Sequence, residues 1–305
     1  MDSDALATFL AVHRRGGVSA AADELSRTQS AISRRLALLE REVGAPLFER
    51  IGRGLVLSEV GAALLPHAER VSAAIGDARA AAEAARSGAG GTVQMVTVGT
   101  LANTTLAAAL QRAQSRHPGL DLRLQTATSA EVSAQVRSGA ASIGLRYFDD
   151  TGAGLERHVL YSERLVVVCA TSHPLAGKRV KTLEQLATQR WLAFPSPERR
   201  SEAFATTVFA QFATRGIDRL DWLAIDSLTA QKRMVQAGFG MALLQESAVD
   251  DELKARELAP VTVGDLDVSV PVVLITRDGG YLGGGAQAVL RELLPGRKSR
   301  LRPRG

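Results

Sequence analysis

Residues 28–40 alternate between apolar and polar positions with the period of an α-helix. Ile32, Leu36 and Leu39 recur every three or four residues, which predicts a buried stripe along one side of a helix. The opposite side carries hydrogen-bonding side chains of modest bulk: Gln29, Ser30, Ser33 and Arg34. Because exposed helix faces more often hold Glu and Lys in i,i+4 pairs, this face is suited to contact with a polar partner.

Two further helices are expected before this one. The apolar positions from Leu6 to Val12 predict a first helix that ends at Gly16–Gly17. Ser19 is expected to cap a second helix and Thr28 to cap the third, through hydrogen bonds to backbone N–H groups. Two short helices joined by about three or four residues are typical of a helix-turn-helix, whose second helix enters the major groove of DNA.

The polar face of the third helix has the chemistry that base edges require. Gln pairs with adenine, Arg pairs with guanine, and Ser contacts bases or phosphates. Apolar runs at 47–48 and 55–57 flank a Gly-Arg-Gly turn, which predicts a hairpin-like wing against the DNA backbone or minor groove. The expected DNA contacts are Ser19, Thr28, Gln29, Ser30, Ser33, Arg34, Arg50 and Arg53. The alternative is a small helical bundle with a polar surface, because many helix pairs share this geometry.

Residues 64–85 place small apolar side chains at alternating spacings of four and three. This pattern is typical of the seam between two coiled helices, although alanines in it bury little surface. A helix pair here would set two DNA-binding modules on a twofold axis. The expected dimer contacts are Leu64, Ala68, Val71, Ile75, Ala78 and Ala82. The alternative is one long helix that packs on its own domain. The stretch ARSGAGGTV that follows predicts a hinge.

From residue 92 onward, short apolar runs alternate with helical patterns. Strands are expected at 93–99, 120–127, 141–147, 164–170, 191–194, 221–225, 241–245 and 268–276, and helices at 104–116, 129–138, 202–215 and 227–237. Such alternation predicts parallel sheets covered by helices. The length of this region favours two α/β subdomains over one.

Open α/β sheets bind ligands beyond the carboxyl ends of their strands, where helix N-termini expose N–H groups. The residues at those ends are 99–103, 127–129, Arg146, 194–196 and Asp226–Ser227. Hydroxyls, helix amides and an arginine that converge on one cleft would suit a small polar solute such as a carboxylate. Each Thr or Ser has the alternative role of a helix cap, and Arg146 that of a structural ion pair.

Residues 9–61, FLAVHRRGGVSAAADELSRTQSAISRRLALLEREVGAPLFERIGRGLVLSEVG, resemble the N-terminal domain of the LysR-type transcriptional regulators. The similarity runs through the AA of the second helix, TQSAIS, the LE that ends the recognition helix, VGAPLFER and the last Gly. Ser30 replaces a common proline, and Ser58–Glu59 stands where Thr is usual. HPGLDLRLQTATSAEVSAQVRSGAASIGLRY and MVQAGFGMALLQES are similar to the effector-binding domain of the same family, which is shaped like a periplasmic solute-binding protein.

The resemblance implies an α/β protein with an N-terminal all-α winged helix-turn-helix at 1–58, a linker helix at 59–88 and a two-subdomain effector domain at 92–305. Subdomain I would span about 92–161 and 267–295, and subdomain II about 162–266. The implied effector contacts are Thr100, Leu101, Thr128, Ser129, Arg146, Pro195, Ser196, Asp226 and Ser227. Asp226 would repel a purely anionic effector unless it caps its helix.

The implied function is regulation of transcription in response to a small molecule. Its partners would be double-stranded DNA, the effector, one or three further copies of the chain, and RNA polymerase. The alternative is a solute-binding or sensor protein of the same fold whose N-terminal helices bind a protein. A solute-binding protein for transport would need a signal peptide, whereas MDSDALATFL carries acids in place of bases.

Composition adds little to the case for DNA. The net charge of +5 arises from residues 291–305, where six bases face one acid. Neither HExxH nor GxSxG occurs, and the five histidines show no metal-ligand spacing, so no catalytic residue, metal or cofactor is expected. GYLGGGAQ lacks the lysine of a phosphate-binding loop and is interpreted as a flexible connection. Cys169, within LVVVCA, is expected to be buried, and the absence of a bilayer-length apolar run indicates a cytoplasmic protein.

Overall fold

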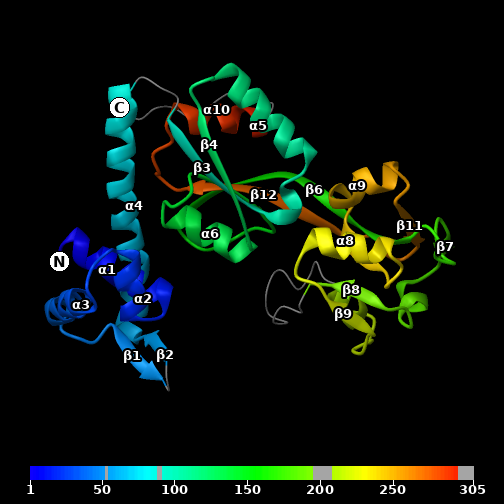
Figure 1. The fold of residues 1–305 in the computed structure, drawn as a ribbon, viewed down its shortest axis with the longest axis horizontal. Coiled ribbons are helices and arrows are strands. Elements are labelled where there is room, and N and C mark those ends of the chain that lie inside the picture. The colour runs from blue at the N-terminus through cyan, green and yellow to red at the C-terminus, as the bar shows by residue number, and fades with distance from the viewer. Residues whose placement is uncertain (52–53, 88–90, 195–207, 295–305) are drawn as a thin grey trace.

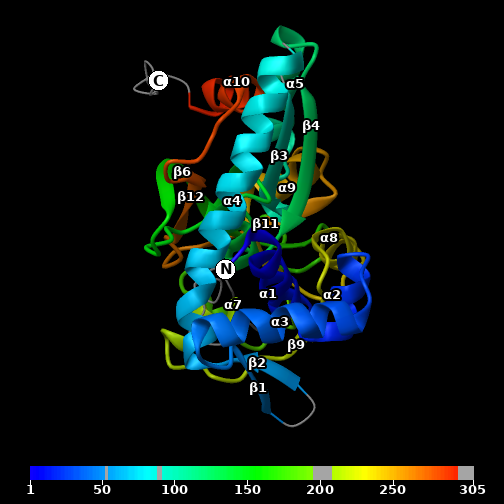
Figure 2. The same cartoon turned by 90° about the vertical axis from the view of Figure 1, so that its left-hand side faces the viewer.

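The computed structural model describes residues 1–51, 54–87, 91–194 and 208–294. Figure 1 shows a small N-terminal domain at one end of a long helix, α4 (Glu59–Ser87), and an elongated α/β region beside that helix. Seen from the side in Figure 2, the hairpin of the N-terminal domain projects beyond the end of α4. The N-terminal domain and the α/β region are therefore connected through one long helix.

Three helices and a hairpin form the N-terminal domain: α1 (Ser3–Arg15), α2 (Val18–Glu24), α3 (Gln29–Val43), β1 (Phe48–Ile51) and β2 (Gly54–Leu57). Phe9 is completely buried, and its ring lies 5.4 Å from that of Phe48 between centroids. Ile32, Leu36 and Leu39 pack into the same core, as their spacing predicts. The apolar stripe of α3 thus fixes which face of this helix remains outside.

The helix caps agree with the sequence for α1 and α3 but not for α2. Gly16, with φ at +67°, ends α1, and Thr28 Oγ1 accepts a hydrogen bond from Ala31 N at 3.2 Å to begin α3. The N-cap of α2 is Gly17, so the prediction that Ser19 caps it is wrong. Val18 packs against the domain core and belongs to the helix, which leaves Ser19 in the first turn, exposed.

The α/β region is built on an eight-stranded sheet in which β4, β3, β5, β12, β6, β11 and β7 are neighbours in that order and β10 also pairs with β6. The strands are β3 (Thr92–Val98), β4 (Asp121–Ala127), β5 (Ile143–Tyr147), β6 (Leu155–Ala170), β7 (Arg179–Val180), β10 (Ala242–Gln245), β11 (Leu258–Val263) and β12 (Ser269–Arg277). A separate parallel pair joins β8 (Trp191–Ala193) and β9 (Trp222–Ala224).

The prediction of parallel sheets is only partly right. β3 pairs in parallel with β4 and β5, but β12 runs antiparallel to β5 and β6, and β6 antiparallel to β10 and β11. The reason is that β6 is 16 residues long and continues from one half of the region into the other. It pairs with β12 at residues 155–164 and with β10 or β11 at residues 165–170.

Helices cover both faces of the first half of the sheet. The helices α5 (Thr104–Arg116) and α10 (Gly284–Leu293) pack with Met95 on one face, whereas α6 (Ser129–Arg137) packs with Val96 on the other (Figure 1). The second half carries α7 (Val208–Ala213), α8 (Leu228–Gln236) and α9 (Glu246–Lys254). Short 3-10 turns, η1 (Gly99–Leu101) and η2 (Leu183–Leu186), follow β3 and β7.

Several elements differ from the sequence predictions. The sequence patterns indicated neither α9 nor α10, nor the strands β7 and β11. GYLGGGAQ is not only a connection, because Gly284 begins α10. Of the helix expected at 202–215, the structure describes α7 at Val208–Ala213, and residues 195–207 lie outside the described residues. Cys169 is completely buried as predicted, and burial raises the pKa of its thiol to about 11.

Candidate functional site

The polar face of α3 is exposed along its first two turns. Thr28 and the side chains opposite the buried stripe, Gln29, Ser30, Ser33 and Arg34, are all exposed. Thr28 Oγ1 and Ser30 Oγ lie 3.1 Å apart and share a hydrogen bond at the helix start. The neighbouring Arg35 is held differently, because its Nη1 lies 2.8 Å from Asp4 Oδ2 of α1. Arg34 is therefore exposed on the polar face of α3, whereas Arg35 is held against α1.

The wing and the second helix place the other predicted DNA contacts. Arg50 is exposed on β1, which pairs with β2 from Phe48–Leu57 to Ile51–Gly54. Arg53 lies outside the described residues. Ser19 is exposed on α2, whose following turn leads directly into α3.

The predicted dimer seam on α4 divides into two parts. Ala68 is completely buried and Leu64 partly buried against the N-terminal core, so Ala68 is not available to a partner and its prediction as a dimer contact is wrong. Val71 is 43% exposed, Ile75 is half-buried, and Ala78 and Ala82 are exposed. The N-terminal domain thus buries the first turns of the predicted seam, and the rest of the seam faces outward.

A cavity of about 580 Å³ lies between the two halves of the α/β region. Thr100, Thr128, Ser129 and Asp226, all predicted effector contacts, line it together with Leu192, Val208 and Leu243 of the second half. The predicted contacts Pro195 and Ser196 lie outside the described residues.

Three predicted effector contacts do not line this cavity. Leu101 is buried in the main core, and Ser227 caps α8, its Oγ accepting from Ala230 N at 3.4 Å. Arg146 is 3% exposed and is held by Asp150, whose Oδ2 lies 2.9 Å from its Nη1, and by Ser133 Oγ at the same distance. Because β5 turns alternate side chains to opposite faces, Tyr147 reaches the cavity and Arg146 does not. The expected contact from Arg146 is thus wrong, and its alternative as a structural ion pair is right.

A chain of hydrogen bonds begins at Thr100 and Tyr147, which line the cavity. Thr100 Oγ1 donates to Tyr147 OH at 3.0 Å, and Tyr147 OH donates to Glu163 Oε2 at 2.9 Å. Ser247 Oγ donates to Glu163 Oε1 at 2.8 Å and accepts from Asn103 Nδ2 at 3.3 Å. Burial, followed by the charge of Glu163, raises the pKa of Tyr147 well above its usual range. The chain connects η1, β5, β6 and α9, and so both halves of the region.

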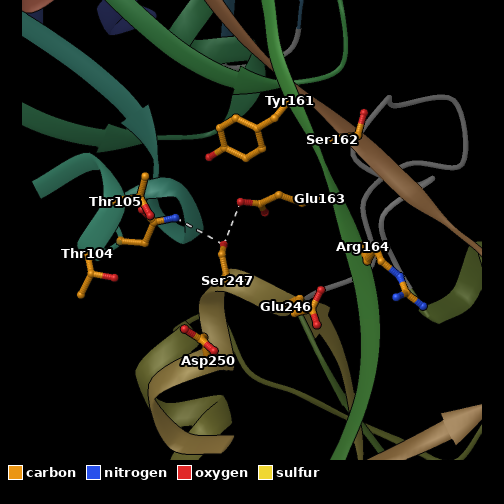
Figure 3. A pocket seen from close by; sticks show the side chains of 10 residues that line it. Thr104, Thr105, Tyr161, Ser162, Glu163, Arg164, Glu246, Ser247 and Asp250 are labelled. Carbon is orange, nitrogen blue, oxygen red and sulfur yellow. Dashed lines mark hydrogen bonds between the residues drawn. The ribbon is translucent and has the colours of Figure 1, made fainter. Parts of the chain in front are cut away.

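A second cavity of about 470 Å³ lies at the other end of this chain (Figure 3). Its lining comes from the start of α5, the crossing segment of β6 and the start of α9. Tyr161 and Glu163 face it from β6, and Asp250 from α9. Burial and the neighbouring charge of Glu163 raise the pKa of Tyr161 to about 12.

Sequence reasoning missed Tyr147, Gln231 and Glu163 at these cavities. Tyr147 follows Arg146 by one residue, and strand alternation could have selected it once the buried face of β5 was known. Gln231 sits one turn into α8, where a polar residue looks like an ordinary exposed position. Glu163 lies at the crossing point of β6, which no local pattern marks.

Comparison with known proteins places both parts of the chain. Residues 3–62 match the model "Bacterial regulatory helix-turn-helix protein, lysR family", and residues 86–297 match "LysR substrate binding domain". The RuBisCO operon transcriptional regulator of Allochromatium vinosum is 26% identical over 285 residues, which cover 93% of this chain and 92% of that protein. The HTH-type transcriptional regulator ShiR of Corynebacterium glutamicum (strain R) is 32% identical over 238 residues, 77% of this chain and 79% of that protein.

Solved structures agree on the fold. Full-length CbnR in complex with its target DNA has a TM-score of 0.60 at 24% identity, over 96% of this chain and 99% of that one. The chain belongs to the LysR family of bacterial transcriptional regulators. It combines a helix-turn-helix DNA-binding domain with an effector-binding domain and regulates transcription in response to an effector.

Two kinds of feature are absent from the residues that the structure describes. No group of three or more His, Cys, Asp or Glu side chains there could hold a metal ion. Within the same residues, no helix has the length and apolar character needed to span a bilayer.

Proposed function

We propose that this regulator reads operator DNA with the exposed face of α3 and binds its effector in the 580 Å³ cavity between the two halves of the α/β region. The observation that carries the DNA assignment is the division of α3. One stripe is locked into the domain core, so Gln29, Ser33 and Arg34 are held on the opposite side at fixed spacing. A rigid helix with polar side chains on its first turns fits the major groove. Thr28, Ser30, Ser19, Arg50 and Arg53 are proposed as flanking contacts.

We place the functional divisions at residues 1–58, 59–88 and 92–305, with subdomain I at about 92–161 and 267–295 and subdomain II at about 162–266. The separate apolar cores of the N-terminal domain and of the α/β region support the first of these divisions. The long β6 and the return into β12 support the second, because the chain passes between the halves there.

The exposed part of the α4 seam supports assembly of the chain into a homodimer or homotetramer. One side of α4 carries an apolar stripe that no other part of the described chain covers. The stripe consists of Val71, Ile75, Ala78 and Ala82. Pairing of two such helices would set two copies of α3 on a twofold axis for a near-palindromic site.

Effector binding would act through the hinge between the halves. The hydrogen-bond chain from Thr100 to Ser247 spans both halves, so a ligand seated on Thr100 changes contacts that connect them. A shift of the hinge in an oligomer would change the separation of the DNA modules, and thus DNA bending and contact with RNA polymerase. We assign the chain no catalytic activity, and we expect it to act in the cytoplasm because the DNA it regulates lies there.

The DNA assignment is tested by selecting duplexes from a random pool with the purified chain and then measuring affinity for the selected sequence. Arg34→Ala should weaken binding by roughly 1–3 kcal/mol and relax the preference at one base pair. Arg219→Ala, which removes an exposed arginine of the second half of the α/β region, is the matched control and should leave affinity unchanged. Equal losses from both variants, or a chain that selects no sequence, would contradict the assignment.

The effector assignment is tested in the same assay. Thr100→Val removes the hydroxyl that faces the cavity, and should abolish the response to effector while operator affinity stays the same. A variant that lost operator binding together with the response would count against the cavity.

A further inference from the structure

The cavity between the halves carries a distribution of hydrogen-bonding groups that selects its ligand. We propose that the effector is an amine: a molecule with a protonated nitrogen on a largely apolar body. This inference rests on the proposed function, which places the effector in this cavity. It concerns only the chemical class of the ligand.

Three of the hydroxyl groups that line the cavity, those of Thr100, Thr128 and Tyr147, already donate their hydrogens within the protein. Tyr147 donates to the Glu163 carboxylate at 2.9 Å, which leaves Tyr147 OH as the acceptor of the bond from Thr100 at 3.0 Å. Thr128 Oγ1 donates to Glu131 Oε2 at 2.9 Å. Each hydroxyl has one hydrogen and two lone pairs, so these three offer a ligand only acceptor sites.

A buried amide adds another acceptor. Gln231 is 1% exposed, lines the cavity and donates its Nε2–H to the carbonyl oxygen of Leu192. That bond fixes the orientation of the amide, because the reverse orientation would set two oxygens against each other. Gln231 Oε1 then lacks a hydrogen-bond partner within the described residues. A buried acceptor without a partner is costly, and a small movement of the Gln231 side chain towards the cavity would let an N–H group of a ligand satisfy it.

The helix end that would attract an anion already holds a carboxylate of its own. The N-terminus of α6 faces the cavity, and such a helix end attracts negative charge. Here Glu131 Oε2 accepts from the backbone N–H of Thr128 at 2.8 Å and completes a capping box. Its hydrogen bonds from Thr128 lower the pKa of Glu131, so this carboxylate is charged at neutral pH.

The remaining charges have the same sign. Asp226 lines the cavity from the second half, and it does not cap α8, because Ser227 does. Neither Lys nor Arg occurs among the lining residues that the structure describes. Arg146, which directly precedes the lining residue Tyr147, forms its ion pair with Asp150 away from the cavity. Val98, Leu192, Val208, Leu228 and Leu243 supply apolar walls for a hydrocarbon body.

The experiment compares amines with carboxylates of matched carbon skeleton on the full chain. The pairs are benzylamine with benzoate, phenethylamine with phenylacetate, and hexylamine with hexanoate, each at millimolar concentration in a thermal unfolding assay. We expect at least one amine to raise the melting temperature and its carboxylate partner to have no effect. Asp226→Asn should weaken binding of that amine roughly fivefold, as the loss of one partly exposed ion pair implies.

A control variant separates the two cavities. Asp250→Asn removes a carboxylate from the second cavity and should leave amine affinity unchanged. Weaker binding in Asp250→Asn together with unchanged binding in Asp226→Asn would overturn the proposal, as would stabilisation by the carboxylates or by none of the amines. If carboxylates stabilise the wild type and Thr100→Val abolishes that stabilisation, the ligand is not an amine but the effector still binds in this cavity. An effector that acts equally well on Thr100→Val would remove the cavity assignment itself.

Discussion

Arg146 gives the sharpest contrast between a role in ligand binding and a role in holding the fold. Its Nη1 reaches both Asp150 Oδ2 and Ser133 Oγ at 2.9 Å, and its Nε donates to the Tyr147 carbonyl at 3.2 Å. Only 3% of the Arg146 surface is exposed, so water does not replace the guanidinium as a hydrogen-bond partner when the side chain is removed. We therefore predict that Arg146→Met destabilises the fold, although it keeps most of the side-chain volume.

The size of the effect follows from the partners left behind. Removing one member of a buried ion pair typically costs 3–5 kcal/mol in free energy of unfolding. Asp150 is 17% exposed and keeps Arg137, whose Nη2 lies 2.6 Å from its Oδ1, so part of its charge stays compensated. We expect a loss of about 3 kcal/mol, or a fall of roughly 1–2 M in the urea midpoint.

The assay is urea unfolding of the full chain, followed by circular dichroism. Arg123→Met is the control, because Arg123 is 62% exposed and pairs with Asp121 at 3.2 Å on the surface, where such pairs contribute less than about 1 kcal/mol. The structural role of Arg146 would be refuted if Arg146→Met unfolded like the control and no longer responded to effector. That result would make Arg146 a ligand contact after all.

Three further predictions concern the pH response of this ion pair, the linker helix and the dimer. Burial would raise the pKa of Asp150, but hydrogen bonds from Ser133, Gly152 and Arg137 lower it to about 2. The charged carboxylate therefore contributes up to about 2 kcal/mol of stability above about pH 4, and this contribution is lost as the pH falls towards 2. The melting temperatures of wild type and Asp150→Asn should therefore converge over that range; a constant gap would contradict the assignment. Gly61→Ala should lower the free energy of unfolding by more than about 2 kcal/mol, because a Cβ there would lie 2.1 Å from the Leu47 carbonyl oxygen. The control is Gly76→Ala on the same helix, whose Cβ would meet nothing within 4 Å. This variant should be neutral or stabilising in thermal unfolding. Val71→Glu should shift the chain towards monomers in analytical ultracentrifugation, and an unchanged mass would exclude this face of α4 from the interface.

Local periodicity was enough to predict the N-terminal domain. The stripe of Ile32, Leu36 and Leu39 defined both the helix and its exposed face, and Thr28 marked its start. Ser19 failed as a cap because Val18 gains burial by joining the helix, a tertiary effect that cap propensity does not contain. Ala68 failed as a dimer contact for a related reason, since the same a/d spacing describes packing on a partner and packing on the domain itself.

The cavity could be predicted only in outline. Thr100, Thr128 and Asp226 follow from the rule that ligands bind at the carboxyl ends of strands, and they line the cavity. Leu101 and Arg146 are adjacent to residues at the cavity but point elsewhere, and sequence alone does not say which face of a buried strand or turn is the inner one. The antiparallel pairing of β6 with β12 was missed because two buried strands read alike in either direction.

The proposed regulator binds its operator through paired α3 helices that contact base edges in successive major grooves. Hydroxyl-radical footprinting of the full chain on the duplex it selects tests this claim most directly. We predict two protected patches, related by a twofold axis and spaced by about one helical turn of 10 base pairs or a multiple of it. A single patch, or even protection of the whole duplex, would contradict it.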